Sequence, residues 1–178
     1  EAVPGVAIRT TCIVGFPGET DADVEQLLDF LREVEFERVG VFTYSRQEGT
    51  RAAQLDDDVP DDLKRERLER VEELQRHITA ARYESRVGIQ ARMLIDAESG
   101  DGRLASGRLP WQADDIDGVT WLDRDVPAGR FAEVEVVEVV DDYDFRVRVL
   151  KLDDAPSPHR TPGRALPVMG SSMGSFGR

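Results

Sequence analysis

One segment combines residue types that could bind a ligand: Ile13-Val14-Gly15-Phe16-Pro17-Gly18-Glu19-Thr20. An apolar, β-branched run precedes it and a helical pattern starts at Thr20, which predicts a strand, a glycine turn and a helix in succession. In α/β folds, ligands bind at the carboxyl ends of parallel strands, where glycine lets the backbone approach and helix starts offer free N–H groups. The alternative is a tight turn at Gly15 and Gly18, with Glu19 at the positive end of the helix dipole. On pattern alone the simple turn is favoured.

A second candidate, Thr43-Tyr44-Ser45, follows the next predicted strand and should face the same sheet edge. It could offer backbone or hydroxyl contacts to a nucleoside, or Tyr44 could be a rim aromatic. Cys12 lies within the apolar run and is typical of a small buried hydrophobe. His77 and His159 have no partners at metal-ligand spacing, so both are expected on the surface.

The cysteine count and the charge exclude several classes of protein. The chain has 178 residues with a single cysteine, which excludes a disulfide framework and any cysteine-ligated iron–sulfur or zinc site made within it. The 23 basic residues against 36 acidic ones give a net charge of −13, which favours a basic partner over nucleic acid. No apolar run approaches the ~18–20 residues of a membrane span, so we expect no membrane contact and a cytoplasmic location.

The elements that must position these residues begin with a βαβ unit. Residues 7–16 predict a strand buried on both faces, residues 38–44 a second strand parallel to it, and the helix between them begins with a capping-box pattern at Thr20 and Asp23. A long helix then starts at Asp61 or Asp62. Its apolar stripe is predicted at helical spacing, with Arg and Glu on a solvated face: Leu63, Leu68, Val71, Leu74, Ile78, Ala81.

From about residue 85 the hydrophobic period changes to two, which predicts antiparallel strands at 87–95, 103–109, 119–122, 131–140 and 145–150. Five strands in so short a stretch indicate a small OB-like barrel. A phase break in the valine pattern around Glu138 predicts a β-bulge. We therefore expect three parts: residues 1–84, a barrel at 85–152 and a disordered Pro-, Gly- and Ser-rich tail at 153–178. Four arginines of the barrel could contact phosphate: Arg86, Arg92, Arg146, Arg148.

Several of these motifs, in this order, resemble the radical SAM methylthiotransferases. The stretches 9–20, 39–45 and 48–53 are similar to the later part of the radical SAM barrel, and the helix with residues 66–78 is similar to the link into the C-terminal TRAM barrel. Within the family, the segments 107–108, 113–119 and 142–145 resemble the RimO branch, which adds a methylthio group to the β-carbon of an aspartate in small-subunit ribosomal protein S-twelve. The fold expected is thus α/β plus β, the C-terminal part of a partial TIM-type barrel followed by a five-stranded antiparallel TRAM barrel.

The resemblance also implies cofactors and a division of roles. The family uses S-adenosylmethionine and two 4Fe-4S clusters, whose ligands are absent from this chain. Because the sequence begins at Glu1 in what resembles the middle of a fold, we expect a piece of a longer enzyme that is inactive alone, without catalytic or metal-binding residues of its own. The resemblance assigns S-adenosylmethionine binding to Gly15, Phe16, Pro17, Gly18, Glu19, Tyr44 and Ser45. It assigns docking of the ribosomal protein to Asp115, Asp117, Asp142 and Asp144.

Departures from the family pattern leave individual roles open: Cys12 replaces the more usual Phe, Phe145 replaces Leu, and Glu19 stands one position late. Two alternatives remain. One is a tRNA methylthiotransferase whose TRAM barrel holds RNA, against which the acidic charge and the segment 116–118 argue. The other is a free-standing TRAM adaptor that binds nucleic acid, which would not need the βαβ unit. A weak RNA contact is compatible with the first interpretation.

Overall fold

The computed structural model describes residues 5–56, 58–113 and 116–156 of the chain, with the side chains of 154–156 left aside. Strand β1 (Arg9–Val14) pairs in parallel with β2 (Arg38–Thr43), and α1 (Asp21–Val34) connects them. This confirms the predicted βαβ unit. Helix α1 begins as predicted, because Thr20 and Asp23 form a reciprocal capping box.

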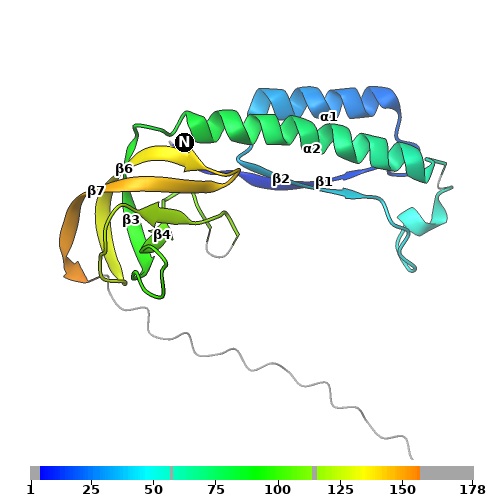
Figure 1. Ribbon diagram of the computed structural model, residues 1–178. Helices are drawn as coiled ribbons and strands as arrows, with labels where there is room; N and C mark the ends of the chain where they lie inside the picture. Colours follow the sequence, from blue (N-terminus) through cyan, green and yellow to red (C-terminus); the bar gives the residue numbers. More distant parts are fainter. Residues whose placement is uncertain (1–4, 57, 114–115, 157–178) are drawn as a thin grey trace, which may run out of the picture.

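Both α1 and the long helix α2 (Asp61–Glu84) lie on one face of the two-stranded sheet (Figure 1). Their apolar stripes and the strands enclose a small core: Val14, Val24, Leu28, Leu31, Phe36, Val71, Ile78. The opposite face of the sheet is open, with Ile13 56% and Phe42 61% exposed. The expectation that β1 is buried on both faces is therefore wrong for this chain, since helices cover only one of them.

The second part is a closed barrel of five strands in the order β3-β4-β5-β7-β6. The strands are β3 (Gln90–Ala97), β4 (Ser106–Arg108), β5 (Thr120–Leu122), β6 (Arg130–Val140) and β7 (Asp144–Pro156). Strands β5 and β7 pair in parallel, so the barrel is mixed and the prediction of a wholly antiparallel one is wrong in this detail. The predicted bulge is confirmed by the register shift between Val136 and Glu138.

The barrel core is apolar and continuous, with these members fully buried: Met93, Leu122, Ala132, Val134, Phe145, Val147. Tyr83 in the last turn of α2 stacks on Phe145, with ring centroids 4.7 Å apart, and so joins α2 to the barrel. Strand β7 continues to Pro156, beyond the expected domain boundary at 152, and most of the predicted tail (157–178) lies outside the described residues. A 3₁₀ turn, η1 (Ala52–Gln54), interrupts the loop between β2 and α2.

A buried carboxylate also connects the two parts. Asp117, in the loop between β4 and β5, is 3% exposed. It accepts hydrogen bonds from Arg9 at 2.8 Å and from Arg38 at 3.2 Å, residues that begin β1 and β2. The barrel is thus attached at the amino ends of the parallel strands, away from their carboxyl edge (Figure 1). In the described residues no helix is long and apolar enough to cross a membrane.

Candidate functional site

The carboxyl edge of the sheet brings the two predicted ligand segments together. The backbone N–H of Tyr44 donates to the carbonyl of Val14 at 2.8 Å, so Tyr44 and Ser45 lie beside the turn that begins at Gly15. The rings of Phe16 and Tyr44 meet edge to face, with centroids 5.2 Å apart. Tyr44 is buried, whereas Phe16 is 42% exposed.

Glu19 faces inward, with its carboxylate bound within the chain. It accepts from the backbone N–H of Gly15 at 2.6 Å and from the guanidinium of Arg67 at 2.8 Å. Arg67 also binds Asp21 at 2.7 Å. Burial would lower the pKa of Arg67, but its hydrogen bonds to these two carboxylates raise it. The Glu19 carboxylate therefore holds the turn in place.

The backbone donors of the turn are mostly satisfied from within. The N–H of Gly18 binds Asp58 at 2.9 Å, and the N–H of Glu19 binds the carbonyl of Phe16 at 2.9 Å. The start of α1 is closed by its capping box. The turn thus offers side chains rather than free N–H groups, and Pro17 is half-buried within it.

Gly15 is required by its surroundings. Its φ of +72° lies in the left-handed region, and an added Cβ would collide with the alkyl stem of Lys64. Lys64 is 5% exposed. Its ammonium lies 3.8 Å from Asp61 and 5.5 Å from the centre of the Tyr44 ring. The side chain of Lys64, a residue of α2, thus covers the turn at Gly15.

Sequence reasoning missed the buried polar residues of α2. Arg67 was assigned to a solvated face, and Lys64 and Gln75 were not among the predicted stripe residues, yet all three are buried, whereas the predicted stripe members Leu63 and Ala81 are not. Together with Val71 and Ile78, these three residues recur at steps of three or four positions. That spacing was the signal in the sequence that this face of the helix is buried. Arg70 forms an ion pair with Glu25 of α1.

The open face and the carboxyl edge of the sheet present exposed apolar and hydroxyl groups. The exposed apolar surface of Ile13, Phe16 and Phe42, with the exposed Ser45 beside it, suits a flat purine ring and its ribose hydroxyls. The described residues contain no group of three or more His, Cys, Asp or Glu side chains that could hold a metal. Cys12 is half-buried, and burial raises the pKa of its thiol, which disfavours the thiolate that ligation needs.

The four aspartates expected at a docking site have different environments. Asp115 lies outside the described residues. Asp117 is committed to Arg9 and Arg38, and Asp144 accepts from the N–H of Val119 at 2.8 Å and from the indole of Trp121 at 3.3 Å. Asp142, in the β6–β7 turn, is exposed.

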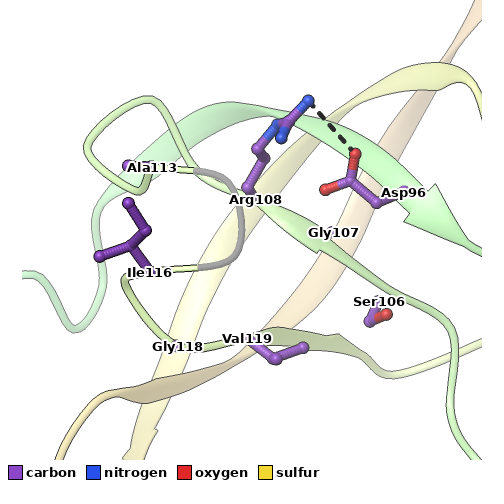
Figure 2. A pocket seen from close by; sticks show the side chains of 8 residues that line it. All are labelled: Asp96, Ser106, Gly107, Arg108, Ala113, Ile116, Gly118 and Val119. Carbon is purple, nitrogen blue, oxygen red and sulfur yellow. Dashed lines mark ion pairs between the residues drawn. The ribbon is translucent and has the colours of Figure 1, made fainter. Parts of the chain in front are cut away.

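A cavity of about 400 Å³ lies on the barrel beside the segment 113–119 (Figure 2). Arg108 and Asp96 form an ion pair of 3.5 Å at one side, and Ile116, 66% exposed, lies at the other. Gly118 has a φ of +79°, and a Cβ there would collide with the carbonyl of Tyr143. In the motif Ile116-Asp117-Gly118, Asp117 is thus the buried carboxylate that binds Arg9 and Arg38, which we call the clamp. Gly118 occupies a position that only glycine fits.

The arginines expected to face phosphate are paired with carboxylates. Arg92 binds Asp153 at 2.7 Å, Arg148 lies 3.6 Å from Glu135, and Arg146 pairs with Glu138. Arg86 was expected to be exposed, but its side chain is 13% exposed and binds Glu37 at 3.2 Å. We call the pairs on β6 and β7, Arg146–Glu138 and Arg148–Glu135, the charge ladder. It lowers the positive potential that RNA would require.

Comparison with known proteins agrees with this architecture. Residues 87–150 match the TRAM domain family. The chain is 44% identical over 151 residues to the ribosomal protein uS12 methylthiotransferase RimO of Desulforudis audaxviator, which covers 84% of this chain and 33% of that protein. It is 40% identical over 170 residues to the RimO of an Anaeromyxobacter species (93% and 36%), and 48% identical over 122 residues to that of Thiobacillus denitrificans (68% and 27%).

The closed barrel and this match define a TRAM-domain protein. More narrowly, the chain is similar over most of its length to proteins named ribosomal protein uS12 methylthiotransferase RimO, the branch that its sequence motifs resemble. It spans about a third of the length of the curated relatives it matches.

Proposed function

We propose that this chain is the C-terminal part of an enzyme that methylthiolates the β-carbon of an aspartate in ribosomal protein uS12, with the TRAM barrel docking the protein substrate. The observation that carries the proposal is the sequence relationship to RimO proteins, which extends over 84% of the chain for one relative and 93% for another. The relatives are named for uS12, a substrate that the acidic charge of this chain suits.

In this proposal the carboxyl edge of the sheet holds S-adenosylmethionine, which would supply the hydrogen-abstracting chemistry when bound. Phe16 would contact the purine face, Tyr44 would hold Phe16 in place by their edge-to-face contact, and Ser45 would meet the ribose. Glu19 would act through Arg67 and Gly15, by fixing the turn rather than by touching the ligand. The ligands for two 4Fe-4S clusters are not among the residues of this chain, so the 178 residues alone should not methylthiolate uS12.

The barrel would dock substrate far from this edge. Lys64 covers the edge and Tyr83 contacts the barrel, and the rise of the helix from one to the other, 19 positions along the chain, is about 28 Å. A docking contact at that distance holds substrate and transition state equally, so it should affect KM more than kcat.

The charge ladder is the structural observation that favours a protein partner over RNA. Each of its arginines already has a carboxylate partner, and a paired guanidinium gains little from a phosphate. The test is titration of the chain with purified uS12 and with a tRNA anticodon stem-loop over a range of salt concentrations. We expect preferential binding of uS12, whereas preferential binding of tRNA with a steep salt dependence would overturn the protein-substrate assignment.

A second measurement addresses the enzymatic part. The complete gene product with reconstituted clusters should add one methylthio group to uS12, detected by mass spectrometry, and the 178-residue chain should add none. Methylthiolation of a tRNA and not of uS12 by the complete enzyme would contradict the proposal.

A further inference from the structure

A groove runs along the junction between the βαβ unit and the barrel. It consists of two adjoining cavities of about 250 and 300 Å³ that share Arg76, Thr79 and Tyr143. The last turns of α2 form one side and the β6–β7 turn forms the other, where the hairpin tip reaches the start of β2 (Figure 1). We call it the junction groove.

The junction groove carries an excess of negative charge. Four exposed carboxylates line it: Glu72, Glu84, Asp141, Asp142. Within the described part of the chain, none of the four forms an ion pair, and neither does Arg76. The other cation of the groove, Arg38, shares the carboxylate of Asp117 with Arg9, so its charge is only partly compensated, and the four carboxylates still outnumber the two arginines. A cationic ligand would therefore be favoured here.

A buried acceptor without a donor lies in the same groove. Gln75 lines the first cavity and is 7% exposed. Its Nε2 donates to the carbonyl of Phe36 at 2.9 Å and to the hydroxyl of Thr79 at 3.1 Å. Because a carbonyl can only accept, Phe36 fixes the orientation of the amide and leaves Oε1 as the free acceptor. That Oε1 is buried and has no hydrogen-bond partner among the described residues. Buried acceptors are normally satisfied, so a water or a ligand that brings an N–H group would complete the hydrogen bonding of this atom.

Tyr143 is an exposed aromatic ring at the centre of the groove. It is 40% exposed, lines both cavities, and is held by Tyr83 and by the guanidinium of Arg38, which lies 3.9 Å from its ring centre. An exposed ring in a fixed position offers apolar contact to the methylene stem of a long cationic side chain.

We propose that the junction groove binds an extended segment of a basic protein partner. A backbone N–H of the segment donates to Oε1 of Gln75 in the first cavity, and a lysine or arginine of the segment lies against Glu84, Asp141 and Asp142 in the second. The proposal rests on the proposed function in taking the partner to be a basic protein, and it places docking on both parts of the chain rather than on the barrel alone.

The test uses the whole chain and a fluorescent peptide of alternating arginine and glycine, with a glutamine–glycine peptide as the uncharged control. The groove variant is Asp141→Asn with Asp142→Asn. Position 141 has a φ of +52°, which asparagine tolerates. The matched control, Glu66→Gln with Glu69→Gln, removes the same charge from exposed positions in the earlier half of α2, outside the cavities of the groove.

We expect the groove variant to bind the arginine peptide about threefold to tenfold more weakly, as befits two exposed charge contacts. The control variant should bind as the unaltered chain does. In an NMR titration the side-chain amide signals of Gln75 should shift on binding of the peptide. Equal weakening in both variants, or unmoved Gln75 signals at saturation, would overturn the groove assignment.

The same titration with uS12 separates the two proposals. If uS12 binds the groove variant as tightly as the unaltered chain, the groove assignment fails and the proposed function stands. If uS12 binds no form of the chain while the peptide binds as expected, the proposed substrate fails and the groove assignment stands. Binding of an RNA oligonucleotide with the Gln75 shift, in preference to the peptide, would overturn the protein nature of the partner.

Discussion

The carboxylate of Asp117 accepts a hydrogen bond of 2.8 Å from the guanidinium of Arg9 across 108 positions of sequence. The same carboxylate binds Arg38 at 3.2 Å and the N–H of Ala113 at 2.7 Å. One buried side chain thus holds the amino ends of both parallel strands against the barrel. Its position sets how the junction groove and the carboxyl edge lie relative to each other.

Replacement of Asp117 by Asn should lower the free energy of unfolding by about 2–3 kcal/mol, because it leaves two guanidinium groups without their carboxylate. Urea unfolding followed by circular dichroism measures this. The control is Asp142→Asn, an exposed position where the change should stay within about 0.5 kcal/mol. Equal stability of the two variants would show that the clamp contributes nothing to the fold.

The sequence was sufficient for features that depend on local chemistry. The Thr20–Asp23 capping box, the start of α2 at Asp61 and the bulge before Glu138 all follow from neighbouring residues, and all three were predicted. What it could not supply depends on distant partners. The parallel pairing of β5 with β7 is one such case, since pairing direction leaves no mark on a three-residue strand.

The candidate site shows the same division. The placement of Gly15 and Tyr44 at one edge follows from parallel strands and was predicted. That Glu19 faces inward depends on Arg67, 48 positions away, which the charge pattern of α2 assigned to solvent. The commitment of Asp117 to the clamp likewise depends on Arg9 and Arg38, which no local pattern connects with it.

Gly118 should tolerate no side chain, whereas Gly129 should tolerate one at modest cost. Both have a positive φ, +79° and +75°, so alanine is strained at either position. At Gly129 an added Cβ meets nothing within 4 Å, but at Gly118 it meets the carbonyl of Tyr143. We expect Gly129→Ala to cost about 1 kcal/mol and Gly118→Ala about 3 kcal/mol or more, measured by urea unfolding. Similar costs would mean that backbone strain alone determines the glycine at position 118.

Glu37 should make the stability of the chain depend on pH in the acid range. Burial alone would raise the pKa of Glu37, but the N–H of Ile8, 2.9 Å from its carboxylate, and the guanidinium of Arg82 hold that pKa below its ordinary value of 4.5. A lowered folded-state pKa stabilises the fold above the unfolded-state value, and this stabilisation is lost as pH falls through the folded-state pKa.

The variant Glu37→Gln tests this. At pH 7 it should be about 2 kcal/mol less stable than the unaltered chain. The difference should shrink as the pH falls below 4.5, because protonation removes the same charge from the unaltered protein. Comparing the two proteins at each pH cancels the contributions of Asp23 and Asp125, whose pKa values are also lowered, by their hydrogen bonds to Thr20 and Ser99. A difference that stays constant with pH would contradict the role given to Glu37.

The charge ladder should weaken RNA binding, and removal of its carboxylates should therefore strengthen RNA binding. In the variant Glu135→Gln with Glu138→Gln, Arg148 and Arg146 lose their partners and become available to phosphate. We expect tighter binding of a tRNA stem-loop, with a salt dependence steeper by about 0.7–1.4 in log–log slope for one or two new single-strand phosphate contacts. Filter binding over a salt series measures both quantities. Glu66→Gln with Glu69→Gln changes the net charge equally without freeing these arginines, so an equal gain in that variant would assign the effect to total charge. If neither variant binds the tRNA stem-loop more tightly, the charge ladder does not determine the choice of partner.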